Sequence, residues 1–154
     1  MLGTLNDAQI EKLLTSNFIG RIGCHAFGKT YVLPVSYAYK DDCVYVHAYE
    51  GLKLSMMRQN PDVCFEVENL VDMGNWQTVI TWGSFKELTD EEERYEALRI
   101  LTSRQFSGVA SKTVQLGNLW PFAPVDISRI DGIVFRILLS EKTGRFENAD
   151  AQPK

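Results

Sequence analysis

The sequence of 154 residues lacks the features that mark membrane, secreted and nucleic-acid-binding proteins. No stretch approaches the ~18 consecutive apolar residues of a membrane-spanning helix. No basic segment precedes an apolar run at the N-terminus, so no signal peptide is expected. The 16 basic residues are scattered among 20 acidic ones, and a net charge of −4 disfavours a phosphate backbone or an anionic lipid surface as partner. These absences predict a soluble cytoplasmic protein with neither nucleic acid nor membrane as partner.

Cysteine and histidine are also scarce, which argues against a metal site and against disulfides. The three cysteines (Cys24, Cys43 and Cys64) form no CxxC pair and fit a reducing compartment. Only His25 and His47 are present, and His47 lies about 13 Å along an expected strand from Cys43, too far to share a metal. The common motifs of serine hydrolases, metalloproteases, phosphate-binding loops and dinucleotide-binding folds are absent. If the protein is an enzyme, a cofactor therefore carries the chemistry.

Apolar residues at 45% and charged residues at 23% indicate a single globular domain over residues 1–154. Apolar periodicity and turn residues predict six strands: Phe18–Ala26, Thr30–Tyr39, Cys43–Ala48, Asp62–Glu68, Trp76–Leu88 and Asp131–Ser140. Helices are expected after the Asn6 N-cap, with Gln9 placed as in a capping box, over Leu52–Gln59, and from Asp90 to about Phe106. A turn is expected at Lys40-Asp41-Asp42. The connections between the first three strands are too short for helical crossovers. The fold class is therefore mainly β, a six-stranded antiparallel barrel with appended helices.

Some positions depart from regular strand patterns. Pro34 lies inside a strand, which predicts an edge, a bulge or an opening of the sheet. Gly83 predicts a bulge or bend in the long strand. Residues 69–75 are expected to form a loop, and the chain after Gly144 to be frayed. Residues 107–129 show no periodicity, and a loop of this length is usually functional or part of an interface.

One strand-to-helix junction has the features of an anion site. Gly51 follows the third expected strand, and Lys53 lies in the first turn of the next helix. A lysine there is unfavourable for the helix itself, because the helix start already carries partial positive charge. Free backbone N–H groups and the ammonium suit a bound anion. The alternative is that Gly51 only turns the chain and Lys53 is solvated.

Several segments, in this order and at this spacing, resemble a known family. They are Gly20-Arg21-Ile22-Gly23, Val32-Leu33-Pro34-Val35-Ser36-Tyr37, Val44-Tyr45-Val46-His47-Ala48, Gly51-x-Lys53, Asn60-Pro61-Asp62-Val63-Cys64-Phe65-Glu66-Val67 and Trp76-Gln77-Thr78-Val79. They are similar to the flavin-nucleotide-binding proteins of the pyridoxamine 5′-phosphate oxidase-like superfamily, and closest to its nitroimidazole-resistance branch. The resemblance implies an FMN-binding split barrel and a homodimer with FMN at the interface.

The resemblance also assigns roles to individual residues. Val35, Ser36 and Tyr37 would lie beside the isoalloxazine ring, and Trp120 could cover it. His47 and Ala48 would line the ring and the ribityl chain, Lys53 would pair with the phosphate, and Thr78 would hydrogen-bond near it. As alternatives, Tyr37, Thr78 and His47 are ordinary sheet positions and Trp120 is a core or interface aromatic. A charged His47 near the cofactor would favour an anionic reduced flavin.

Two departures from the family argue against oxidation of pyridoxamine phosphate itself. The phosphate segment has Leu52-Lys53 in place of a basic doublet, and the last strand contains Arg136 but no Arg-x-Arg. The sequence favours an FMN-dependent oxidoreductase that reduces a nitroaromatic or quinone-like electrophile by hydride transfer. A non-catalytic flavin-binding or stress-related module remains open, as does a split barrel that binds haem or a deazaflavin. No residue is assigned a catalytic role.

Overall fold

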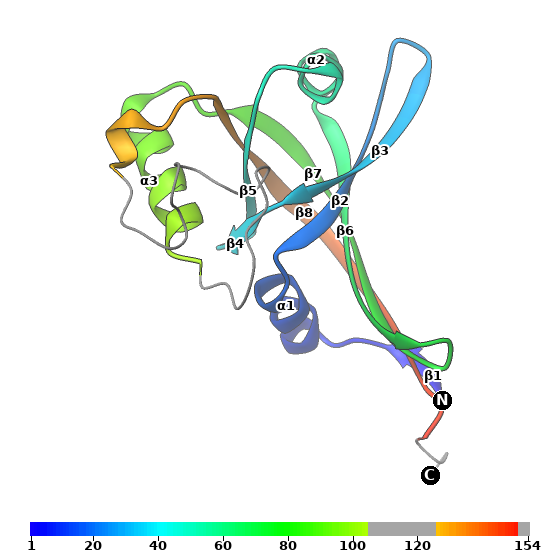
Figure 1. Ribbon diagram of the computed structural model, residues 1–154. Helices are drawn as coiled ribbons and strands as arrows, with labels where there is room; N and C mark the ends of the chain where they lie inside the picture. Colours follow the sequence, from blue (N-terminus) through cyan, green and yellow to red (C-terminus); the bar gives the residue numbers. More distant parts are fainter. Residues whose placement is uncertain (105–125, 151–154) are drawn as a thin grey trace.

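The computed structural model describes residues 1–104 and 126–150, and these form one curled antiparallel sheet with helices around it (Figure 1). The strands are β1 (Leu2–Thr4), β2 (Ile19–Ala26), β3 (Lys29–Ser36), β4 (Ala38–Lys40), β5 (Cys43–Ala48), β6 (Asp62–Asp72), β7 (Asn75–Glu87) and β8 (Ile133–Asn148). The helices are α1 (Asp7–Ser16), α2 (Leu52–Gln59), α3 (Glu91–Thr102) and the single 3-10 turn η1 (Ile127–Arg129). Within these ranges no helix is long and apolar enough to cross a membrane.

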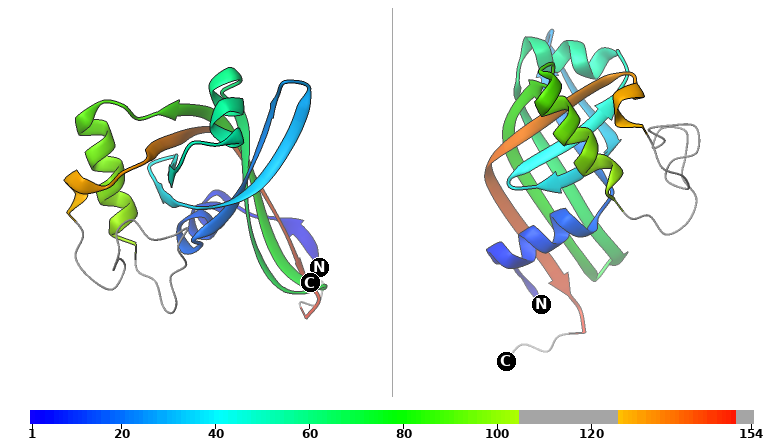
Figure 2. Two further views of the ribbon diagram at one scale, coloured as in Figure 1. Left: turned by 45° about the horizontal axis from the view of Figure 1, so that its top comes forward. Right: turned by 90° about the vertical axis from the view of Figure 1, so that its left-hand side faces the viewer.

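The strand order confirms the expected split barrel. The sheet runs β3-β2-β6-β7-β8-β5-β4, with β1 added to β8, and every pair is antiparallel. The sheet curls round without closing, since β3 and β4 form its two edges (Figure 2). The six expected strands become eight in the described residues, partly because the second one is broken at Tyr37. The N–H of Tyr37 still donates to the carbonyl of Phe18 at 2.9 Å, in register with the β2–β3 pairs, and the next residue, Ala38, pairs with Tyr45 on β5.

Two sequence-based expectations about irregular strand positions are confirmed. Pro34 lies on the edge strand β3, where only one side of the backbone needs a ladder partner. Gly83 lies where the register between β7 and β8 shifts after Trp82. A Cβ on Gly83 would come within 2.3 Å of the carbonyl oxygen of Leu138, so the bulge depends on glycine.

The expected loop at residues 69–75 is wrong, and the expected fraying after Gly144 is wrong as far as Asn148; residues 151–154 lie outside the described residues. β6 and β7 form a tight hairpin, and β8 continues to Asn148 between β7 and β1. Phe146, for example, is opposite Gln77 on one side and Gly3 on the other. Pairing on both sides, with strands remote in sequence, orders this end of the chain. These strands form an arm that projects past α1 (Figure 1).

The helices close the curl of the sheet. α1 begins with the expected capping box between Asn6 and Gln9 and contacts β4, β6, β7 and β8. α2 contacts β2 at the opposite end, and α3 covers β4, β5 and β8 and ends before the expected Phe106. The core between them contains the fully buried Phe65 and Phe135. This packing sets the start of α2 beside the end of β5.

Candidate functional site

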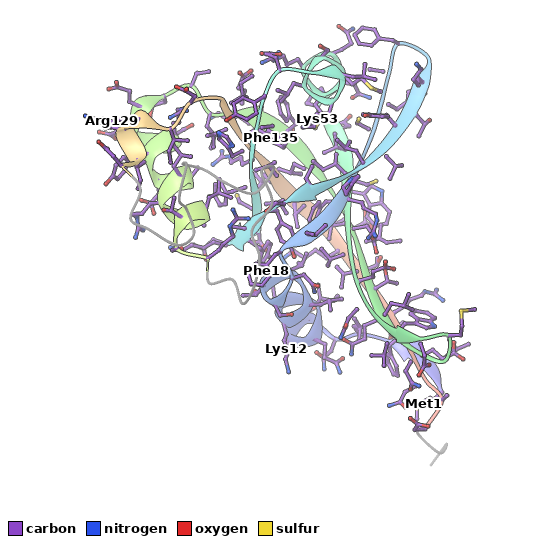
Figure 3. The ribbon with its side chains drawn as sticks, in the orientation of Figure 1. Met1, Lys12, Phe18, Lys53, Arg129 and Phe135 are labelled. Carbon is purple, nitrogen blue, oxygen red and sulfur yellow. The ribbon has the colours of Figure 1, made fainter. Side chains whose placement is uncertain are left out.

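The junction between β5 and α2 has an open helix start, as the sequence predicts. Gly51 is the N-cap of α2 and provides no side-chain hydrogen bond to the first turn. The buried Leu54, Met56 and Met57 fix the helix to the core. Lys53 lies in the first turn of α2, at the end of the molecule opposite Met1 (Figure 3). Backbone N–H groups without a side-chain cap, next to an ammonium, form a site that an anion can occupy.

The end of β3 carries three of the predicted flavin-binding residues, and their side chains face different surroundings. Val35 is buried, and Ser36 is half-buried with its hydroxyl oxygen accepting from Arg104 Nη1 at 2.7 Å. Tyr37 is fully buried, and its hydroxyl donates to the carbonyl of Leu14 at 2.5 Å. The side chain of Tyr37 is thus part of the core, and its N–H and carbonyl are both hydrogen-bonded within the chain, to Phe18 and Arg104.

Arg104 is a member of this neighbourhood that sequence reasoning missed. Its guanidinium also donates to the carbonyls of Tyr37 at 3.0 Å and Leu101 at 2.8 Å. Burial lowers the pKa of Arg104 to about 10, so the group still carries its charge at pH 7. It brings a positive charge to the end of β3, beside Ser36. Only the tertiary fold brings residue 104 beside Ser36, so no local pattern could have shown it.

His47, near the end of β5, is held by a neighbouring backbone segment. Its Nε2 lies 2.5 Å from the carbonyl oxygen of Asp131, so Nε2 carries the hydrogen and donates it. Gly132 has φ 92°, and a Cβ there would come within 2.8 Å of His47 Nε2. Arg94 Nη2 donates to the carbonyls on either side, Ile130 at 2.8 Å and Gly132 at 3.2 Å. Three successive carbonyls before β8 are therefore bound by side chains.

The electrostatic surroundings of His47 differ from the sequence-based expectation. Burial lowers the pKa of the imidazole, and the charges of Arg94 and Arg104 lower it further. His47 is therefore neutral at pH 7, and its charge can act on a cofactor only in acid. Ala48, the next residue, is buried at the end of β5.

Thr78 lies far from the other predicted residues within the same chain. It pairs with Glu68 on β6 and Arg145 on β8, at the arm end of the sheet. Glu68 is six residues along β6 from Asp62, which corresponds to about 20 Å from the α2 end of that strand. The Thr78 hydroxyl donates to Glu66 Oε1 at 3.1 Å. One copy of the chain therefore does not bring Thr78 and Lys53 together.

The predicted Trp120 lies outside the described residues. Within residues 1–104 and 126–150, no group of three or more histidine, cysteine, aspartate or glutamate side chains could hold a metal ion. His25, the other imidazole, is exposed and its Nδ1 lies 3.0 Å from the hydroxyl of Thr30.

A separate apolar groove of about 680 Å³ lies on the outer face of the sheet. Register places Val32, Gly23, Cys64 and Trp82 in one row across β3, β2, β6 and β7. A Cβ on Gly23 would come within 2.5 Å of Cys64 Sγ, so the absence of a side chain there hollows the row. Of the predicted flavin-binding residues that the structure describes, none lines this groove. Alternation of apolar residues along each strand could have indicated the face, but only the strand order brings the row together.

Comparisons with known proteins agree on the fold. A family model described as pyridoxamine 5′-phosphate oxidase matches residues 6–145. An uncharacterised protein of Rhizobium meliloti is 25% identical over 142 residues, covering 89% of each chain. The crystal structure of a FAD-binding protein from Mesorhizobium loti has 29% identity and a TM-score of 0.73, covering 96% of this chain and 99% of its own.

A candidate 5-nitroimidazole antibiotic resistance protein from Bacteroides thetaiotaomicron has the same fold at 20% identity. Its TM-score is 0.69, and the match covers 95% of this chain and 89% of that one. Likeness at this identity shows the fold alone. The family model, in contrast, matches most of the chain, from the residue before α1 to the part of β8 that pairs with β1. The chain therefore belongs to the pyridoxamine 5′-phosphate oxidase family of split-barrel proteins.

Proposed function

We propose that the protein binds FMN with its phosphate at the start of α2. The observation that carries the proposal is the α2 N-terminus without a side-chain cap, with Lys53 in its first turn. Likeness to a FAD-binding protein at 29% identity supports a flavin as the ligand. The ring would lie along the backbone of Val35–Tyr37 and beside His47 and Ala48. Arg104 would add positive charge near Ser36.

We propose further that the flavin site is completed by a second copy of the chain. Thr78 and Lys53 lie at opposite ends of one copy, and a partner related by twofold symmetry can bring its Thr78 towards this Lys53. On the outer face of the sheet Thr78 lies beside the charged Glu66, and another part of the same face is apolar and exposed. Val32 is 64% exposed, Leu138 47% and Trp82 42%, an unusual amount for a surface in contact with water. A second copy on this face would bury these side chains.

The activity that fits this site is reduction of a small electrophile, a nitroaromatic or a quinone, by a cytoplasmic FMN-dependent oxidoreductase. A bound flavin supplies hydride transfer: it accepts two electrons and a proton from a donor and passes them to the electrophile. The chain would bind and orient the ring and keep its phosphate in place. Oxidation of pyridoxamine phosphate is not proposed, since the phosphate segment has Leu52-Lys53 and the stretch from Asp131 to Ile137 has the single arginine Arg136.

The absorption spectrum of the purified protein tests the cofactor, and mass spectrometry of the released group identifies it. We expect flavin bands and the mass of FMN. The mass of FAD would change the assigned cofactor from FMN to FAD. A Soret band would assign haem, and the mass of a deazaflavin would assign that group, and either result would refute the proposal of FMN. Sedimentation at micromolar concentration should give a dimer, and a monomer would contradict the shared site. Anaerobic reduction followed by mixing with a nitroaromatic or a quinone tests turnover. A bound flavin that neither substrate reoxidises would favour a non-catalytic binding module.

A further inference from the structure

A single arginine at the end of α2 holds two carboxylates beside the proposed phosphate site. Arg58 Nη1 and Nη2 donate to the two carboxylate oxygens of Glu50 at 2.9 and 2.7 Å. Its Nε and Nη2 donate to both oxygens of Glu87, the last residue of β7, at 3.0 Å each. One guanidinium thus forms two bidentate ion pairs, and the pair with Glu50 spans α2 from its last turn back to the residue before Gly51.

The position of Glu50 makes this pairing more than a surface ion pair. Glu50 immediately precedes Gly51, which provides no side-chain cap to α2. A carboxylate next to a helix start is attracted to its partial positive charge, and here also to the charge of Lys53 in the first turn. An unpaired Glu50 would therefore compete with, and repel, an anion bound there. The bidentate contact with Arg58 neutralises Glu50 and also lowers its pKa, so that it stays ionised and paired.

We infer that Arg58 is a positioning residue that holds Glu50 away from the start of α2 and so keeps this site open to a phosphate. This inference rests on the proposed function, since the phosphate is that of the flavin. Glu87 contributes by anchoring the other side of the guanidinium to the end of β7. Exposed ion pairs of this kind contribute little to folding stability, so the effect is expected in ligand binding.

The inference predicts opposite consequences for the two partners of the ion pair. Arg58→Gln releases a charged Glu50 and should weaken FMN binding about fivefold. This is the effect expected from repulsion between two unit charges about 4 Å apart in water. Glu50→Gln removes the competing charge and should bind FMN as tightly as the wild type or more tightly. The double variant should match Glu50→Gln. If the ion pair only stabilised the local structure, both single variants would instead bind FMN equally weakly.

Fluorescence titration of the refolded apoprotein with FMN and with riboflavin, which lacks the phosphate, measures these effects. We expect the Arg58→Gln change to appear with FMN and to be absent with riboflavin. Lys86→Gln, which breaks an exposed ion pair with Glu93 elsewhere, is the matched control and should leave both affinities unchanged. If Arg58→Gln does not fold, Glu50→Gln alone decides, because weaker FMN binding in that variant overturns the inference.

The remaining outcomes separate the inference from the proposed function. Equal affinity of the wild type for FMN and riboflavin would refute the phosphate site, and the inference with it. A phosphate preference that Arg58→Gln leaves unchanged, or that Glu50→Gln weakens as much, would refute the inference and leave the proposed function standing.

Discussion

Substitution of Tyr37 by phenylalanine tests whether its hydroxyl belongs to the protein core or contacts the proposed ligand. Tyr37→Phe removes one oxygen from a fully buried side chain and leaves its ring packed edge-on against Phe65, with ring centroids 4.8 Å apart. The lost hydrogen bond leaves the carbonyl of Leu14 without its 2.5 Å donor. That carbonyl belongs to the last turn of α1, where intrahelical donors run out.

The expected magnitude follows from leaving a buried acceptor without a partner. Removing one partner of a buried hydrogen bond costs about 1–3 kcal/mol, and the substitution creates no cavity larger than an oxygen atom. A loss of about 2 kcal/mol lowers the Tm of a domain of this size by about 4–8 °C. Urea unfolding at one fixed protein concentration measures the difference, since the stability of the proposed dimer would depend on concentration. Tyr95→Phe, on an exposed part of α3, is the control and should change stability by less than about 0.5 kcal/mol.

The difference in stability between the wild type and this variant depends on pH in a defined direction. Burial raises the pKa of Tyr37. Below pH ~10 the phenol is neutral in both the folded and the unfolded chain. Above it, the unfolded chain loses the proton first and therefore binds fewer protons, so wild-type stability falls as pH rises, by up to about 1.4 kcal/mol per pH unit. Tyr37→Phe escapes this loss, and the gap between the two proteins should narrow above pH ~10. Unchanged stability together with weakened flavin binding would show that the hydroxyl faces the ligand and would refute the assignment to the core.

Three further substitutions test the site and its supports. Lys53→Ala should weaken FMN binding about ten- to a hundredfold, from the loss of a charge-assisted contact of about 1.5–3 kcal/mol, and should leave riboflavin binding unchanged in the same titration. Gly132→Ala should destabilise by about 2–4 kcal/mol in urea, because strain at φ 92° adds to the close approach to His47, whereas Gly28→Ala, at φ 70° with open space around it, should show the strain alone. His47→Gln should leave the reduction potential of bound flavin unchanged at pH 8, where the imidazole is neutral, and should lower it at acidic pH; a lower potential at pH 8 would show that the bound flavin restores the charge.

The sequence alone determined the features that depend on neighbouring residues. The capping box of Asn6 and Gln9, the turn at Asp41-Asp42 with its positive φ angles and the open start of α2 all follow from local backbone chemistry. The bulge at Gly83 was also visible in the sequence, since a glycine inside a long strand marks a local irregularity. The order and spacing of such local motifs were enough to indicate the split-barrel family.

The tertiary structure decided what depends on partners remote in the chain. β8 extends to Asn148 because β1 and β7 pair with its two sides, and residues near the two ends of a chain show no such pairing in a local pattern. Tyr37 has an apolar ring and a hydroxyl that suits either a ligand or a core, and the Leu14 carbonyl, supplied by α1, settles it. Thr78 and Lys53 lie at opposite ends of the sheet because strand register sets distance along a β-sheet, and sequence motifs contain no register. The charge of His47 at neutral pH, likewise, is set by burial and by Arg94 and Arg104, which only the fold brings near it.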